Sequence, residues 1–260
     1  MNTFTPRQVA ICLAVLLAFL IPYTLGWAWG WWKFAATSTV IVLLWFWARP
    51  QGFAADLGIR GRRTDFALAI LSLLVVGIAA RLLIPGILRQ HGYSPGHADL
   101  TWTFLAIPFQ TLNEEMVLRA LLLTALAHIL KVRFLVSIVV AGFFTLVHFV
   151  LYRFGPPQTS LSVQALTALL LMGFAFNEFF LATGSIAVPW AIHLGWNLTR
   201  FGNNWIGQGP SGTLQQGPDF NLIEGNPEVI ALVAALALIA SSARFRLLPY
   251  RVCANVKTLL

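Results

Sequence analysis

The chain has 260 residues, of which 58% are hydrophobic and only 10% are charged. Soluble domains carry about 25% charged residues, so this composition excludes an ordinary soluble domain and predicts a polytopic membrane protein. The formal net charge is +8, but the basic residues lie in short loops between apolar segments. That distribution is typical of membrane topology and argues against a nucleic-acid-binding protein.

The apolar segments predict an all-α fold, a transmembrane bundle of about eight helices, because each crossing needs about 20 apolar residues. The ten-residue alternation of a membrane barrel is absent from the sequence. The predicted spans are Arg7–Trp29, Trp31–Ala48, Asp65–Leu88, Trp102–Leu130, Phe134–Tyr152, Leu161–Ala182, Ser185–Ile206 and Glu228–Ala243. We interpret the first as a retained helix rather than a cleaved signal peptide, because apolar sequence resumes almost at once after it.

Basic residues recur in every second connection between the predicted spans. Arg60, Arg62 and Arg63 lie in one loop, Lys131 and Arg133 lie in another, and the C-terminal tail is also basic. With eight spans these segments share one side of the membrane. The positive-inside rule therefore predicts that both termini are cytoplasmic.

Two adjacent acids, Glu114 and Glu115, interrupt the apolar run from Trp102 to Leu130. An ionisable group at the centre of a bilayer costs at least about 2.5 kcal/mol, so such groups usually have a function. Glu115 and Arg119 are four residues apart and can pair on one helix face. Glu114 is rotated from Glu115 by about 100° and points elsewhere, which makes it a candidate general base. A purely structural ion cluster is the alternative.

Further polar side chains occur in two later apolar spans. His148 lies in one, and His193 and Asn197 share a helix face of another because they are four residues apart. A lone histidine on an apolar helix is more often a packing residue than a catalyst. Together with Glu114, however, these groups reduce their desolvation cost most simply by lining one polar cavity. A carboxylate that activates water, with imidazole and amide groups that stabilise charge on oxygen, suits hydrolysis of a carbonyl compound.

The remaining polar features have plainer interpretations. Glu178 is expected to be structural, paired with Arg200 or Arg81 or close to the cytoplasmic interface. Cys12 and Cys253 have no metal-site spacing and are expected to be free thiols.

One long polar segment, Gly207–Pro227, is rich in Gly, Pro, Gln and Asn. Such a composition favours a solvated connector between two helices. A lid or substrate-contacting loop is the alternative.

Three short motifs follow one another along the chain: Glu114-Glu115-x-x-x-Arg119, Phe144-x-x-x-His148 and His193-x-x-x-Asn197. In order and spacing they resemble the motifs of the CPBP family of CAAX prenyl proteases and bacteriocin-processing or immunity proteins, also called the Abi family. The resemblance extends from about Thr101 to Phe201. It implies an intramembrane endopeptidase with a buried site, in which the first glutamate and the first histidine activate water and the last two residues form an oxyanion hole. The implied catalytic residues are Glu114, His148, His193 and Asn197, with Glu115 and Arg119 in support.

The resemblance also suggests how the chain is organised and whether the reaction needs a cofactor. Residues 1–100 would hold N-terminal transmembrane helices, 101–206 the catalytic core, and 207–260 a polar external loop, the last helix and a basic cytoplasmic tail. No cofactor is expected, because asparagine is a poor zinc ligand and no HExxH motif occurs. A divalent metal such as zinc, held by Glu114, His148 and His193, is the less favoured alternative.

Two other functions remain open. A non-proteolytic scaffold or immunity protein of the same fold would need the helices but not Glu114. A proton-coupled transporter is less favoured, because the sequence shows no internal repeat.

For the peptidase, the expected partners are membrane lipids and a membrane-embedded or lipid-adjacent protein or peptide substrate, without nucleic acid. The expected location is a bacterial inner membrane, as a multi-pass protein.

Overall fold

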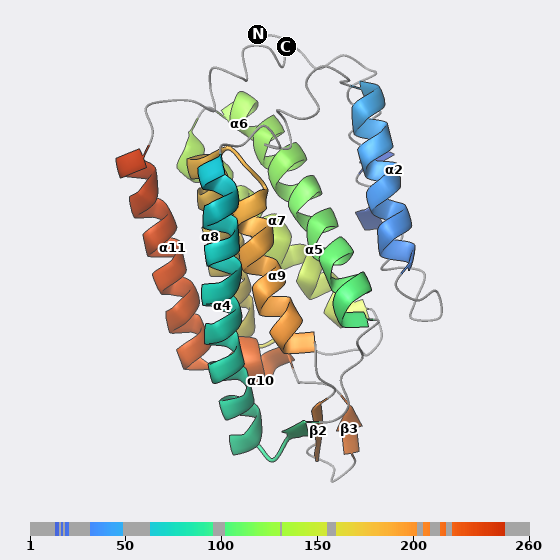
Figure 1. The fold of residues 1–260 in the computed structure, drawn as a ribbon, viewed down its shortest axis with the longest axis vertical. Coiled ribbons are helices and arrows are strands. Elements are labelled where there is room, and N and C mark those ends of the chain that lie inside the picture. Colours follow the sequence, from blue (N-terminus) through green and yellow to red (C-terminus); the bar gives the residue numbers. More distant parts are fainter. Residues whose placement is uncertain are drawn as a thin grey trace.

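Long helices lie side by side along the long axis of the molecule (Figure 1). A computed structural model describes residues 14–15, 17, 19–20, 32–48, 63–95, 102–130, 132–154, 160–201, 205–208, 214–216 and 220–247. The predicted all-α transmembrane bundle is confirmed, because each long described element is a helix.

The helices follow the predicted spans to within a few residues. They are α2 Trp32–Ala48, α4 Arg63–Gln90, η2 Trp102–Ala106, α5 Ile107–Glu115, η3 Met116–Leu123, α6 Thr124–Leu130, α7 Arg133–Phe154, α8 Val163–Thr183, α9 Ala187–Phe201, α10 Phe220–Glu224 and α11 Pro227–Leu247. The segments η2, α5, η3 and α6 are consecutive and fill the long fourth span. The first predicted span, Arg7–Trp29, lies mostly outside the described residues.

Several helices are suited to a lipid environment. α4, α7 and α8 are long and apolar enough to cross a membrane, and α2 and α11 are shorter apolar helices. Large apolar side chains point outward from the bundle, for example Leu82 on α4 and Leu146 on α7. In a helix the backbone N–H and C=O groups bond to one another, so they need no partners from lipid, which offers none. The protein is therefore a multi-pass integral membrane protein.

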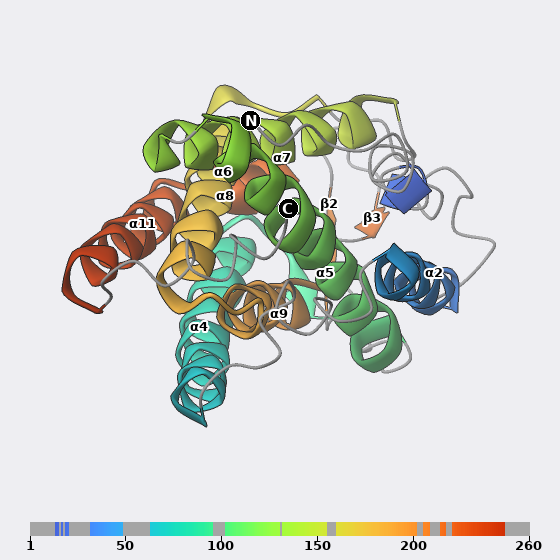
Figure 2. The ribbon, with the colours of Figure 1, turned by 90° about the horizontal axis from the view of Figure 1, so that it is seen from above.

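Two glycines allow neighbouring helices to approach closely. A Cβ atom at Gly195 of α9 would lie 2.9 Å from the carbonyl oxygen of Leu73 and 3.2 Å from the backbone nitrogen of Gly77, both on α4. A Cβ atom at Gly173 of α8 would lie 3.2 Å from the Cα atom of Ala141 on α7. Small residues at helix contacts are a common device in membrane bundles. Seen from above (Figure 2), α4 and α9 lie next to one another, and α8 contacts both α7 and α11.

One end of the bundle departs from the predicted fold. Short antiparallel strands form there in the order β1-β2-β3, with bounds Ser94–Pro95, Trp205–Gln208 and Leu214–Gln216 (Figure 1). The predicted span Ser185–Ile206 is therefore too long, since α9 ends at Phe201. The interpretation of Gly207–Pro227 as a plain connector is also wrong, because it contains β3 and the helix α10. Pairing of β3 with the neighbouring β2, and the burial of Phe220, Ile223 and Glu224 of α10, give this polar stretch a structure that its composition does not indicate.

Candidate active site

The two acids Glu114 and Glu115 are the last residues of α5, and the π-helical segment η3 begins directly after them. Their exposed fractions are 4% and 0%. π-Helical turns, which are wider than α-helical ones, are rare in proteins overall, but those that occur are often at functional sites. The sequence predicts a uniform helix here and does not reveal this change in winding.

Glu115 joins two helices through one carboxylate oxygen. Its Oε1 lies 3.2 Å from Nη1 of Arg119, as the spacing predicted, and 2.9 Å from Nδ1 of His193 on α9. The contact with His193 was not foreseen. A carboxylate that is paired with arginine accepts hydrogen bonds, so Nδ1–H of His193 donates to Glu115 and Nε2 faces the other way.

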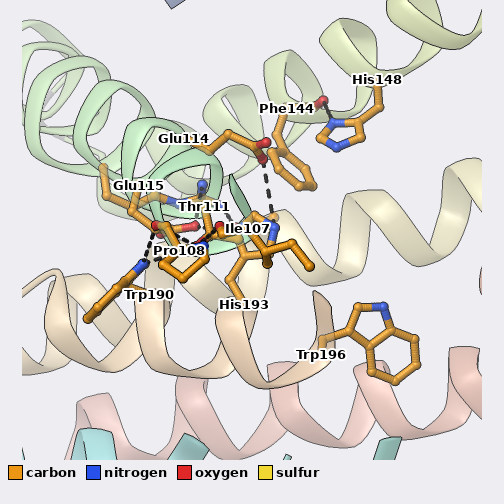
Figure 3. Close-up of polar contacts among 12 residues, drawn as sticks. Ile107, Pro108, Thr111, Glu114, Glu115, Phe144, His148, Trp190, His193 and Trp196 are labelled. Carbon is orange, nitrogen blue, oxygen red and sulfur yellow. Dashed lines mark hydrogen bonds and ion pairs between the residues drawn. The ribbon is translucent and has the colours of Figure 1, made fainter. Parts of the chain in front are cut away.

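Glu114 lies on that other side of the same imidazole. Its Oε2 is 3.7 Å from Nε2 of His193, and Figure 3 shows the two side chains pointing toward one another. Helical rotation therefore separates the two glutamates, and both still meet His193 from opposite ring nitrogens. The two glutamates thus face different atoms of one ring, and that they do different work stays a prediction.

Arg119 is enclosed by protein. Its Nη2 donates to the carbonyl oxygen of Gly173 at 3.5 Å. Its guanidinium carbon lies 5.2 Å from the ring centroid of Phe144 and 5.1 Å from that of Phe176. Aromatic faces attract a cation, so these rings and the Glu115 carboxylate compensate a charge that has no access to water.

His148 lies on α7, and its ring turns toward its own helix (Figure 3). Nδ1 donates to the carbonyl oxygen of Phe144 at 2.9 Å, and the two rings are 4.3 Å apart. Glu114, His193 and Arg200 are all close enough to His148 to interact with it electrostatically. With Nδ1 engaged by the backbone, Nε2 of the neutral ring is the atom that accepts a proton.

Asn197 lies one helical turn after His193 on α9 and is 8% exposed. Within the ranges that the structure describes, its side chain makes no hydrogen bond. The structure thus places Glu114, Glu115, Arg119 and His193 in direct contact, with His148 in electrostatic range and Asn197 on the same face of α9 as His193.

A second polar cluster, Tyr152, Arg200 and Glu224, was missed. Nε of Arg200 lies 2.7 Å from Oε1 of Glu224, and each residue is 2% exposed. The ring of Phe220 lies between Arg200 and Tyr152, with its centroid 4.5 Å from the guanidinium carbon of Arg200 and 4.5 Å from the ring centroid of Tyr152. Glu178 was one predicted partner of Arg200, but the acid paired with Arg200 is Glu224 of α10. The four-residue spacing of His148 and Tyr152 was visible in the sequence, whereas the place of Glu224 depends on how α10 packs.

In the part of the chain that the structure describes, no three His, Cys, Asp or Glu side chains are grouped so as to hold a metal ion.

Residues 96–199 match the family model described as Type II CAAX prenyl endopeptidase Rce1-like. These residues form an Rce1-like CAAX protease domain. The resemblance seen in the three motifs is therefore confirmed, and the family is one of membrane endopeptidases. Comparisons with curated proteins and with solved structures gave no match. The Rce1-like domain includes every motif residue and ends one position before Arg200.

Proposed function

We propose that this chain hydrolyses a peptide bond in a membrane-associated protein or peptide precursor, with a water molecule activated by Glu114. One observation carries the proposal. Inside a domain of a peptidase family, Glu114 and Glu115 from α5 meet the two ring nitrogens of His193 from α9. Ionisable groups gathered in this way within apolar helices are costly and are rarely retained without a function.

Glu114 is the general base of this reaction. It takes a proton from water while the water oxygen bonds to the carbonyl carbon of the scissile peptide, which becomes tetrahedral and carries its charge on oxygen. Nε2 of His148 accepts a second hydrogen bond from the same water and orients it. No serine or cysteine nucleophile is required.

His193 and Asn197 stabilise the negative oxygen. Glu115 accepts the Nδ1 proton of His193 and so fixes the ring. The cluster of two carboxylates and one guanidinium is electrically neutral when one proton is shared between Glu114 and His193, which suits a site in low dielectric. In this state Nε2–H of His193 and the side-chain amide of Asn197 are the two donors to the oxyanion.

The tetrahedral intermediate then breaks down to the two products. The tetrahedral carbon re-forms its carbonyl, the carbon–nitrogen bond breaks, and the leaving amine receives the proton that Glu114 had taken from water. One product ends in a new carboxylic acid, which keeps the other proton of the water, and the other product begins with a new amine.

Purified protein in liposomes, mixed with a quenched fluorescent peptide that ends in a farnesylated CAAX sequence, tests the proposal. General-base catalysis contributes about 10²–10⁴-fold, so Glu114→Gln should lower kcat at least a hundredfold. Glu178→Gln is the matched control, because it removes another fully buried carboxylate from the same domain.

A second measurement identifies natural substrates. The termini of membrane proteins are compared by proteomics in cells that express the wild-type chain and in cells that express Glu114→Gln. Equal cleavage of the fluorescent peptide by Glu114→Gln and wild type, or no cleavage of any substrate by the wild-type protein in either assay, would refute the proposed activity.

A further inference from the structure

The short helix α10 connects the ends of three long helices at one end of the bundle (Figure 1). The ring of Phe220 lies 4.5 Å from that of Tyr152, which lies in the last turn of α7. Asn221 accepts a hydrogen bond from the backbone nitrogen of Ser162 at 2.7 Å, just before α8. Glu224 pairs with Arg200 of α9. Three residues of α10 therefore contact the ends of α7, α8 and α9.

The ion pair in this contact is enclosed by protein. The guanidinium of Arg200 lies 4.3 Å from the ring centroid of Phe201 and 4.5 Å from that of Phe220. Oε1 of Glu224 also accepts a hydrogen bond from Nε1 of Trp196 at 3.4 Å. Buried charges need their partners in specific positions, so such a pair fixes orientation more than it adds net stability.

Helical spacing aligns this pair with the candidate active site. His193, Asn197 and Arg200 are four and three residues apart and lie on one face of α9. On α7, His148 and Tyr152 are four residues apart and also share a face. Phe220 of α10 joins the two faces one turn beyond the catalytic side chains, because its ring lies 4.5 Å from that of Tyr152 and 4.5 Å from the guanidinium carbon of Arg200.

We infer that Arg200, Glu224 and Tyr152 are positioning residues, which hold α7 and α9 so that His148 and Asn197 face Glu114. This inference rests on the proposed function. The inference adds three residues to the proposed site. Two of them, Arg200 and Glu224, lie beyond the Rce1-like domain at 96–199. The geometry also gives the polar segment after α9 a role, because α10 connects that segment to the site.

Steady-state kinetics on the farnesylated fluorescent peptide separate positioning from plain structural support. A misplacement of about 1 Å can cost a hundredfold in rate. Glu224→Gln should therefore lower kcat about tenfold to a hundredfold, with KM changed less than about twofold. Glu224→Asp, which keeps the charge, should recover part of that loss. Glu228→Gln is the matched control, because Glu228 is an exposed acid four residues later.

Tyr152→Leu keeps the inference testable if Glu224→Gln does not fold. It removes the ring that contacts Phe220 and leaves an apolar side chain in its place, so kcat should fall several-fold in the folded variant. The inference is overturned if Tyr152→Leu, and any folded Glu224→Gln, keep the wild-type kcat and change only the melting temperature. In that result Glu114→Gln still loses activity and the proposed function stands. If Glu114→Gln is fully active, both the proposed function and this inference fail.

Discussion

Replacing Arg119 by methionine should destabilise the protein strongly, because it leaves Glu115 as a buried carboxylate without its cation. The residue is fully buried, and its partners are Glu115 at 3.2 Å, the carbonyl oxygen of Gly173 at 3.5 Å and two aromatic rings. Removal of one member of a buried ion pair costs about 3–5 kcal/mol. For a protein of this size about 1 kcal/mol lowers the melting temperature by about 2–4 °C, so we expect a loss of roughly 6–20 °C.

A double variant separates the unpaired charge from the lost packing. Arg119→Met combined with Glu115→Gln removes both charges of the pair, so Glu115 no longer leaves an unpaired buried charge and the double variant should be more stable than Arg119→Met alone. Arg153→Met, at an exposed site near the end of α7, is the matched control and should change the melting temperature little.

Thermal unfolding in detergent, followed by intrinsic tryptophan fluorescence, measures all of these variants. A melting temperature of Arg119→Met within about 2 °C of wild type would show that Glu115 and Arg119 do not form the buried pair described here. A double variant less stable than Arg119→Met would show that charge compensation is not the dominant contribution of Arg119.

Three further variants or treatments test other parts of the argument. Gly195→Ala should cost about 1–3 kcal/mol, since its Cβ would lie 2.9 Å from the carbonyl oxygen of Leu73, while Gly86→Ala, with nothing within 4 Å, should be neutral or stabilising in thermal unfolding. Equal stabilities of the two would contradict the close approach of α4 and α9. Asn197→Ala should lower kcat about 10²–10³-fold with little change in KM if its amide binds the oxyanion, and an unchanged kcat would remove it from the mechanism. Dialysis against 1,10-phenanthroline should leave peptide cleavage unchanged, and a loss that zinc restores would instead support a metal-dependent reaction.

The positions of the helices follow from local sequence. Apolar runs of sufficient length become helices in lipid because the backbone has no other partner for its hydrogen bonds. The pairing of Glu115 with Arg119 is local in the same sense, since both residues lie one turn apart on one helix. The family resemblance was also readable, because it depends on residue types and spacing within 96–199.

The contacts between helices could not be read in this way. His193 reaches Glu115 only because α9 packs against α5, where Nε1 of Trp190 donates to Oγ1 of Thr111 at 3.0 Å. Spacing along one helix says which residues share a face. It does not say which neighbouring helix that face meets, because crossing positions depend on many weak side-chain contacts summed over the bundle.

The sequence by itself therefore determined the membrane helices, the acidic pair with its arginine, and the Rce1-like match over residues 96–199. The tertiary structure alone decided that both glutamates meet one histidine, and that Glu224 pairs with Arg200. The reason is physical. Helical hydrogen bonds and apolar runs depend only on a continuous stretch of sequence. A buried charge, in contrast, is stabilised by whichever distant side chain the packed helices bring next to it.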